Sequence, residues 1–219
     1  MIGNNDGGKD KITLEIPKGW NDAGDFHKVC IKISGHPEFA FENMDGWIKN
    51  EKEFILKEGI KNIIDNNYFL LYPITKNENA LLLIGYGYAS NPSRLNVIVL
   101  NNDYPEVIFS EDMVIRKYMD LNCDSIPDFV LLPWLSETYG PDFRFKSYVP
   151  YLVYTMIRQS GQWKMIYDEK LSIQYTNDNS YGWAGRNFSD SLVVFKPKNE
   201  NKPRVMKLKE AEKLYKMEK

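Results

Sequence analysis

Four oxygen-bearing side chains at regular spacing are the residues best suited to chemistry in this chain. Positions one, three, five and nine of a short polar stretch are Asp120, Asn122, Asp124 and Asp128. Calcium takes six to eight oxygen ligands, and alternate side chains of a tight loop can converge on one ion. Ile126, at position seven, could add its backbone carbonyl. Carboxylates held this close repel one another, so a bound dication would stabilise the loop.

The neighbouring sequence favours the calcium interpretation. Apolar residues precede the stretch at 113–115, and a strand-like apolar run, Phe129–Leu132, follows it directly. Such an arrangement predicts a loop between two strands. The chain is rich in Asp and Asn, however, so a metal-free turn closed by hydrogen bonds from the backbone to these side chains is the alternative.

The stretch resembles the calcium loop of FG-GAP and VCBS-type repeats, the modules of integrin-α-like β-propellers. Those loops read roughly D-x-N-x-D-G-x-x-D and lead into an apolar strand. The resemblance implies that calcium braces a loop between propeller strands, with these ligands: Asp120, Asn122, Asp124, Asp128 and the carbonyl of Ile126. Ser125 stands where the family usually has glycine. A residue other than glycine at a positive φ costs energy, so this departure predicts weaker calcium binding.

The sequence after this loop is similar to that of small periplasmic lysozyme inhibitors or immunity proteins with a propeller-like fold. A strand, a polar and aromatic loop at 135–147, and a Y-x-x-Y-L-x-Y strand at Tyr148–Tyr154 follow one another. In such inhibitors a loop enters the cleft of a hydrolase. The resemblance implies a protein partner, with a cell-wall hydrolase as one candidate and the 135–147 loop in the binding face.

Aromatic side chains gather in two polar stretches, at 134–145 and 175–188. Exposed aromatic residues on loops are typical of protein and carbohydrate recognition. Arginine adds donors that can pair with an acidic partner. The residues expected to contact a partner are Trp134, Tyr139, Phe143, Arg144 and Trp183. The alternative is that half or more of the aromatic side chains pack against a sheet.

Signatures of catalysis are weak in this chain. Neither the histidines, His27 and His36, nor the cysteines, Cys30 and Cys123, are spaced as a nucleophile pair or a zinc site would require. Unpaired thiols are expected rather than a disulfide.

The expected function is a non-enzymatic, calcium-braced binding protein of the bacterial envelope or exterior. Because carboxylate pairs for glycan hydrolysis can lie far apart in sequence, a glycan-acting hydrolase stays open as an alternative, as does a carbohydrate-binding or adhesion module.

Short aromatic and β-branched runs separated by turn residues predict a mainly β fold in a propeller-like or sandwich arrangement. The expected strands are Lys11–Ile16, Phe26–Ser34, Tyr68–Ile74, Ala80–Tyr88, Leu95–Leu100, Glu106–Phe109, Asp128–Leu132, Tyr151–Arg158, Trp163–Tyr167 and Ser191–Phe195. Ser160 and Gly161 are typical of a hairpin turn. Apolar periodicity and end signals predict peripheral helices over Asp45–Glu58 and Lys207–Met217. We expect a flexible segment at 1–10, one β-rich domain at 11–206, and a C-terminal helix or tail at 207–219.

Composition narrows the function classes further. The chain has 219 residues, is 43% hydrophobic and carries a net charge of −2, so it can bury a sizeable core but has no excess of Lys and Arg. This balance argues against nucleic acid or an anionic membrane as the main partner. No apolar run reaches the roughly 18 residues of a membrane-spanning helix. The polar, Gly-rich start carries no export signal, which fits a cytosolic chain or a mature exported one, and the calcium loop favours a periplasmic or secreted location.

Overall fold

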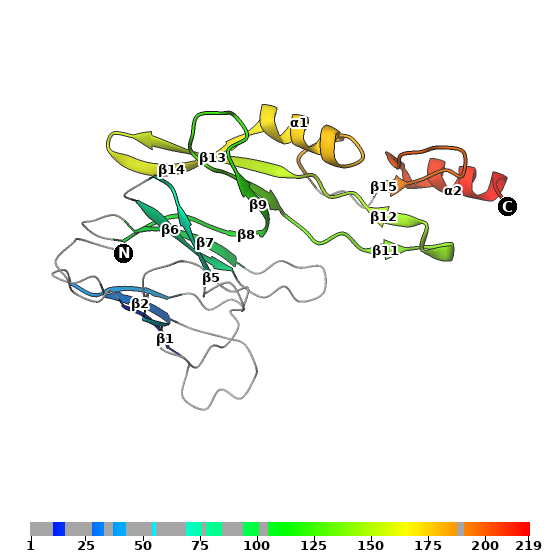
Figure 1. Cartoon of the computed structure of the whole chain (residues 1–219). Helices are drawn as coiled ribbons and strands as arrows, with labels where there is room; N and C mark the ends of the chain where they lie inside the picture. The colour runs from blue at the N-terminus through cyan, green and yellow to red at the C-terminus, as the bar shows by residue number, and fades with distance from the viewer. Residues whose placement is uncertain are drawn as a thin grey trace. The chain divides into compact units, whose positions relative to one another are not determined.

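The computed structural model describes most of the second half of the chain and shorter stretches of the first (Figure 1). The described residues are 11–15, 28–32, 37–42, 54–55, 69–75, 78–84, 94–100, 105–187 and 191–219. Within them the fold is mainly β, with antiparallel sheets and two α-helices, which confirms the predicted fold class at this level. None of the sheets in these stretches closes on itself. The propeller-like or sandwich arrangement therefore stays a prediction.

The first two sheets of the described residues each contain four strands. One has the order β3-β2-β1-β4, with these bounds: β1 (Lys11–Glu15), β2 (Lys28–Lys32), β3 (Phe39–Glu42) and β4 (Phe54–Ile55). The other is a meander in chain order: β5 (Phe69–Pro73), β6 (Asn79–Ile84), β7 (Arg94–Leu100) and β8 (Glu106–Asp112). Val97 at its centre is fully buried and pairs with Leu82 on one side and Phe109 on the other.

Two further four-stranded sheets follow in the described residues. The third has the order β14-β13-β10-β9, with these bounds: β9 (Val114–Met119), β10 (Asp128–Leu132), β13 (Leu152–Gln159) and β14 (Gln162–Asp168). The fourth has the order β11-β12-β15-β16, with these bounds: β11 (Thr138–Tyr139), β12 (Phe145–Ser147), β15 (Leu192–Phe195) and β16 (Arg204–Lys207).

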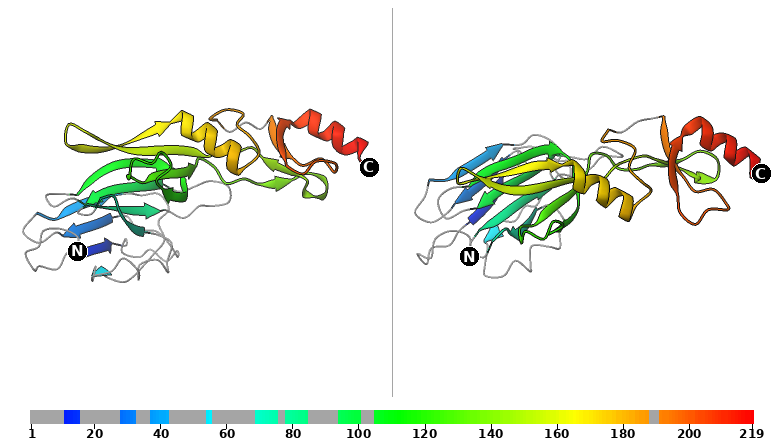
Figure 2. Two further views of the ribbon diagram at one scale, coloured as in Figure 1. Left: turned by 45° about the horizontal axis from the view of Figure 1, so that its top comes forward. Right: turned by 90° about the horizontal axis from the view of Figure 1, so that it is seen from above.

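In the described residues, two α-helices, visible in Figure 2, and one 3-10 turn connect or follow these strands. A 3-10 turn, η3 (Pro141–Phe143), joins β11 to β12, α1 (Glu169–Asn179) follows β14, and α2 (Leu208–Met217) follows β16. Of the helices in the described stretches, none has the length and apolar character needed to cross a bilayer.

The described residues fall into two compact units. The first contains β1 to β8 together with residues 156–165, the tip of the β13–β14 hairpin. The second contains residues 114–155 and the described residues from 166 onward, and both helices belong to it. The single β-rich domain expected over 11–206 stays a prediction.

Most of the predicted strands are confirmed, with ends that differ by a few residues. Ser160 and Gly161 have φ angles of 52° and 85°, as the two-residue turn of a β-hairpin requires. The helix predicted after Lys207 is confirmed as α2. The strand expected from Tyr148 begins only at Leu152. Pro150 in between has no N–H to donate to a strand partner.

The predicted helix over Asp45–Glu58 lies outside the described residues except at Phe54 and Ile55. There the prediction is wrong, because these two residues form β4 and pair with Ile12 and Lys11 of β1. Aromatic and β-branched residues favour a strand when a neighbouring strand is available. At Phe54 and Ile55, apolar periodicity alone therefore predicted the wrong type of secondary structure.

α1 is held on the third sheet by polar side chains. Asp168 caps its first turn. Ser172 accepts a hydrogen bond from the Val153 N–H at 2.7 Å, and Thr176 accepts one from the Tyr151 N–H at 3.1 Å. The hydroxyls of Ser172 and Thr176, one helical turn apart, thus accept hydrogen bonds from two backbone N–H groups at the start of β13. These N–H groups are satisfied by side chains of α1 and not by a neighbouring strand.

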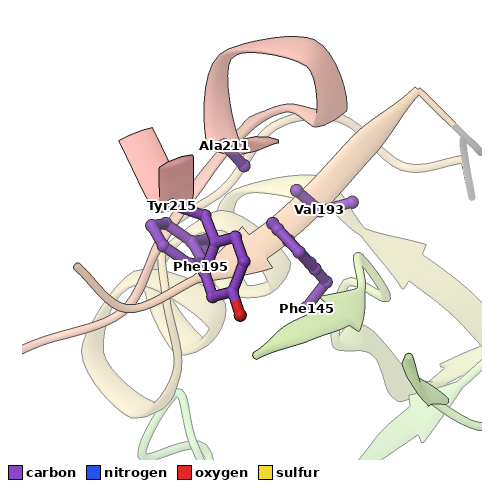
Figure 3. Packing of buried hydrophobic residues seen from close by; sticks show 5 residues of the cluster. All are labelled: Phe145, Val193, Phe195, Ala211 and Tyr215. Atoms are coloured by element: carbon purple, nitrogen blue, oxygen red, sulfur yellow. The ribbon is translucent and has the colours of Figure 1, made fainter. Parts of the chain in front are cut away.

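The fourth sheet and α2 share a core of their own (Figure 3). Its buried side chains are Phe145 from β12, Val193 and Phe195 from β15, and Ala211 and Tyr215 from α2. The Phe145 and Phe195 rings stack with centroids 5.2 Å apart, and the Tyr215 ring meets Phe145 edge-on at 5.9 Å. Because Phe145 is only 2% exposed and packed on two sides, it fixes the chain directly after η3.

Candidate functional site

The acidic stretch forms the loop that joins β9 to β10. Met119, the last residue of β9, pairs with Asp128, the first residue of β10, so the strand ladder closes the loop at its base. Asp120, Asn122 and Asp124 lie in the loop itself. The predicted position of this stretch between two strands is confirmed.

Backbone amides of the loop donate to its acidic side chains. Asp120 accepts hydrogen bonds from the Asp124 N–H at 3.2 Å and from the Ser125 N–H at 2.9 Å. Asn122 Oδ1 accepts from the Asp124 N–H at 3.0 Å, and Asp124 Oδ1 accepts from the Ile126 N–H at 2.7 Å. These bonds are those of a metal-free turn. A carboxylate oxygen that accepts one N–H still has a lone pair for a cation.

Asp128 bears the least favourable charge of the loop. The residue is 1% exposed, and its Oδ2 accepts a hydrogen bond from the Leu121 N–H at 2.8 Å. Burial raises the pKa of this carboxyl above its ordinary value, and the charges of Asp124 and Asp120 raise it further, while the bond from Leu121 opposes them. The charges of Asp120 and Asp124 thus act on Asp128. A divalent cation among them would remove this penalty.

Two residues of the loop have left-handed backbone conformations. Cys123 has a φ of 63° and Ser125 a φ of 69°. The resemblance to FG-GAP loops, which have glycine at this position, predicts a positive φ at Ser125, and this prediction is confirmed. The positive φ at Cys123 was not predicted. Such angles cost of order 1–3 kcal/mol each in residues other than glycine. The Cys123 side chain is exposed and its thiol is free, as expected.

The donor set of the loop fits calcium in kind. Carboxylates, an amide and a backbone carbonyl are the hard oxygen ligands that calcium prefers. In the described residues, however, no three His, Cys, Asp or Glu side chains already converge closely enough to hold a metal. Calcium binding would therefore have to draw the carboxylates of Asp120, Asp124 and Asp128 together.

The turn η3 holds the chain in a strained conformation between β11 and β12. Gly140 has a φ of 78°, and a Cβ at this position would lie 2.3 Å from Cδ2 of Phe145, so only glycine fits. Asp142 and Phe143 follow with φ angles of 56° and 51°. Strain of this kind persists only where the surroundings fix the backbone, and it clusters at ligand-binding sites.

Side chains on both sides of the turn anchor it. The Tyr215 hydroxyl of α2 donates to Asp142 Oδ2 at 2.5 Å. Arg144 donates to the carbonyl oxygen of Lys196 at 2.6 Å and forms an ion pair with Glu218 at 3.4 Å. These contacts tie the turn to the helix and to the segment after β15.

Acid should weaken the bond between Asp142 and Tyr215. The Tyr215 hydroxyl, and after it the charge of Lys219, lower the pKa of the Asp142 carboxyl below its ordinary value. A carboxyl of this kind contributes stability above its unfolded-state pKa and loses it as the pH falls through its folded-state pKa. In urea unfolding below about pH 4, we therefore expect the wild type to lose stability more steeply than Tyr215→Phe. Parallel pH profiles would contradict this prediction.

Phe143 projects from the anchored turn with 75% of its surface exposed. Of the large apolar side chains in the described residues it is the most exposed, followed by Met217 at 74%. Burying a phenylalanine side chain stabilises a protein by roughly 1.5–3 kcal/mol. The fold forgoes this stabilisation at Phe143 while holding its backbone in a strained conformation.

Three of the predicted partner-binding residues lie together on the fourth sheet, and of these only Phe143 is exposed. Tyr139 is half-buried and packs against the core of this sheet. Arg144 is half-buried, with its guanidinium 5.2 Å from the ring centroid of Phe195. Both side chains pack beneath the turn on the core of the fourth sheet, and Phe143 alone of the three is exposed.

The two predicted tryptophans lie on other segments. Trp134 follows β10 and is half-buried. Trp183 follows α1, is also half-buried, and its backbone N–H donates to Asn177 Oδ1 at 2.7 Å. Their part in binding stays a prediction.

Sequence reasoning missed Gly140, Asp142 and Tyr215, the residues that shape and anchor the turn. The Gly140-Pro141 dipeptide is a turn signal that could have located its start. No local signal joins Asp142 to Tyr215, because 73 positions separate them.

The chain matches no protein-family model, and no curated protein or solved structure matches it. The resemblances drawn from the sequence therefore stay predictions. Function has to be inferred from the loop at 120–128 and the turn at 140–144.

Proposed function

We propose that this chain is a non-enzymatic, calcium-braced binding protein of the bacterial envelope or exterior. It binds a protein partner through the turn at 140–144, with Phe143 as the anchoring side chain. A cell-wall hydrolase is the candidate partner, which would make the chain an inhibitor or immunity protein. The observation that carries this proposal is the 75% exposure of Phe143 on a turn anchored on both sides.

The fixed conformation of the turn supports a binding role. Protein interfaces are dominated by a few anchoring residues, many of them aromatic or arginine. Ordering a loop on binding also costs free energy, and a backbone that is already held in place avoids this cost. The bonds of Asp142 and Arg144 hold the backbone of Phe143 before any partner arrives.

Cations and carboxylates alternate around the base of the turn, where Arg144 pairs with Glu218 and Lys219 with Asp142. Lys219, Arg144 and Lys198 all lower the pKa of Asp142, so their charges act on this turn. A complementary partner would present an apolar pocket for Phe143, with polar groups of both charges at the rim of the pocket. Such complementarity favours fast and selective association.

Calcium has a structural role in this proposal. Its ligands would be Asp120, Asn122, Asp124, Asp128 and the carbonyl of Ile126. The ion would supply the positive charge that the buried Asp128 carboxylate lacks. A ligand that binds only the folded chain stabilises it by about 2.7 kcal/mol at a concentration of 100 times Kd.

The location and the partner class rest on the two resemblances drawn from the sequence. The order of a loop between β9 and β10, then β-structure, then the turn at 140–144, is compatible with them. A propeller-like arrangement, or a sandwich in its place, is part of the same proposal. The β5–β8 meander in chain order supports the propeller-like form, whose blades are meanders of this kind.

Truncating the anchor tests the proposal. We expect Phe143→Ala to weaken inhibition of a purified bacterial cell-wall hydrolase roughly 30-fold or more, the loss that removing a hot-spot residue produces. Initial rates of peptidoglycan hydrolysis at increasing protein concentration give the inhibition constants. Met217→Ala is the matched control, because Met217 is 74% exposed on α2 but lies outside the turn.

The two parts of the proposal fail in different ways. If wild-type protein neither binds nor inhibits the hydrolase, the partner class is wrong. If Phe143→Ala inhibits as well as wild type, the turn is not the binding face.

A further inference from the structure

An open cavity of about 180 Å³ lies in the second unit beside the acidic loop, and its charged side chains are exposed to solvent. β9 contributes Lys117 to its wall, and the loop contributes Leu121. α1 contributes Leu171, Gln174 and Tyr175 among others. Because hydroxyl bonds hold α1 on β13, this wall is formed before any ligand binds.

The two charged side chains of this cavity stand on different walls. Lys117 comes from β9 and Asp178 from α1. In the part of the chain that the structure describes, neither forms an ion pair. The Lys117 ammonium lies 5.7 Å from the ring centroid of Tyr175, on the apolar part of the wall.

Asp178 lies where a negative charge is unfavourable for α1 itself. It belongs to the last turn of the helix, where the free carbonyls already carry partial negative charge. This turn contains no basic residue. Asn179 donates from Nδ2 to the Tyr175 carbonyl at 3.0 Å, which leaves its Oδ1 as a further acceptor. The α1 end of the cavity therefore favours a cation, while Lys117 favours an anion.

We propose that this cavity binds an aliphatic amino acid in its zwitterionic form. The ligand carboxylate pairs with Lys117, and the ligand ammonium pairs with Asp178 and Asn179 Oδ1. The aliphatic side chain contacts Leu121 and the Tyr175 ring. An α-amino acid carries both charges next to one apolar group in a body small enough for this cavity. The site is separate from the turn at 140–144 and does not depend on the partner proposed there.

Calorimetric titration of the full chain with L-leucine and two analogues tests this site. Leucinamide lacks the carboxylate, and 4-methylpentanoate lacks the ammonium. We expect leucine to bind wild-type protein and each analogue to bind roughly two- to fivefold more weakly, because each analogue loses one ion pair with an exposed side chain. This comparison needs no variant, so it stands even where a substitution disturbs folding.

Two variants assign the charges to their residues. Lys117→Met should weaken leucine binding roughly two- to fivefold and leave leucinamide binding unchanged, while Asp178→Asn should weaken leucine binding to a similar extent and leave 4-methylpentanoate binding unchanged. Lys164→Met is the control, because Lys164 lies on β14 outside the cavity and bonds to Gln159. No binding of leucine by the wild type at millimolar concentration, or equal affinity in wild type and both variants, would overturn the proposal.

Discussion

Replacing Gly140 with alanine should lower the free energy of unfolding by about 3 kcal/mol or more. The new Cβ would lie 2.3 Å from Cδ2 and 3.0 Å from Cε2 of Phe145. The ring cannot move aside without cost, because it is 2% exposed and stacks on Phe195. Gly140 also has φ 78° and ψ −176°, a conformation that is essentially restricted to glycine. Urea unfolding of the variant and the wild type measures the loss.

Gly161→Ala separates the steric effect from the backbone effect. Gly161 has a φ of 85°, but nothing lies within 4 Å of a Cβ built there. Its replacement should therefore cost only the backbone strain, about 1 kcal/mol. Equal losses for the two variants would contradict the view that contact with Phe145 shapes the turn. If the proposed partner is a hydrolase, the Gly140→Ala variant should also inhibit it less well, because the backbone of Phe143 is displaced.

Asp128→Asn should raise the melting temperature in chelator and remove most of the stabilisation that calcium produces. In chelator, the amide still accepts from the Leu121 N–H but carries no charge, so burial and repulsion by Asp120 and Asp124 no longer oppose folding. The melting temperature in chelator should therefore rise. In calcium, the variant lacks one carboxylate ligand and should lose most of the ion's stabilisation. That stabilisation is about 2.7 kcal/mol at 100 times Kd, or roughly 5–10 °C for a chain of this size.

Scanning calorimetry of wild type and variant, each in calcium and in chelator, gives the four melting temperatures required. Asp112→Asn is a suitable control, because Asp112 is an exposed carboxylate on β8 that pairs with Arg94 and lies outside the loop. Calcium should raise the melting temperature of Asp112→Asn by as much as it raises that of the wild type. An equal shift in Asp128→Asn would exclude Asp128 as a ligand.

The strands and the acidic loop could be predicted because their signals are local. The apolar run at Leu95–Leu100 predicts a strand, and β7 is buried along nearly its whole length. The loop was recognisable because polar positions alternate directly before an apolar strand, Asp128–Leu132. The resemblance to FG-GAP loops also predicted the positive φ at Ser125, since those loops turn sharply at this position.

The features that could not be predicted depend on contacts between distant residues. α1 buries Ser172 and Thr176, whose hydroxyls bond the backbone of β13, so the helix shows little apolar stripe in its sequence. The bond between Asp142 and Tyr215 joins residues that no spacing rule connects. β4 forms because β1 offers it a partner, which the periodicity of its own sequence does not reveal.

Thermal unfolding of the wild-type chain in chelator and after addition of calcium tests calcium bracing most directly. We expect saturating calcium to raise the melting temperature by about 5 °C or more. The shift should disappear in Asp120→Ala and Asp124→Ala, which remove carboxylates that the loop amides now hold. Identical melting curves in calcium and in chelator would contradict calcium bracing and show that residues 120–128 form a metal-free turn.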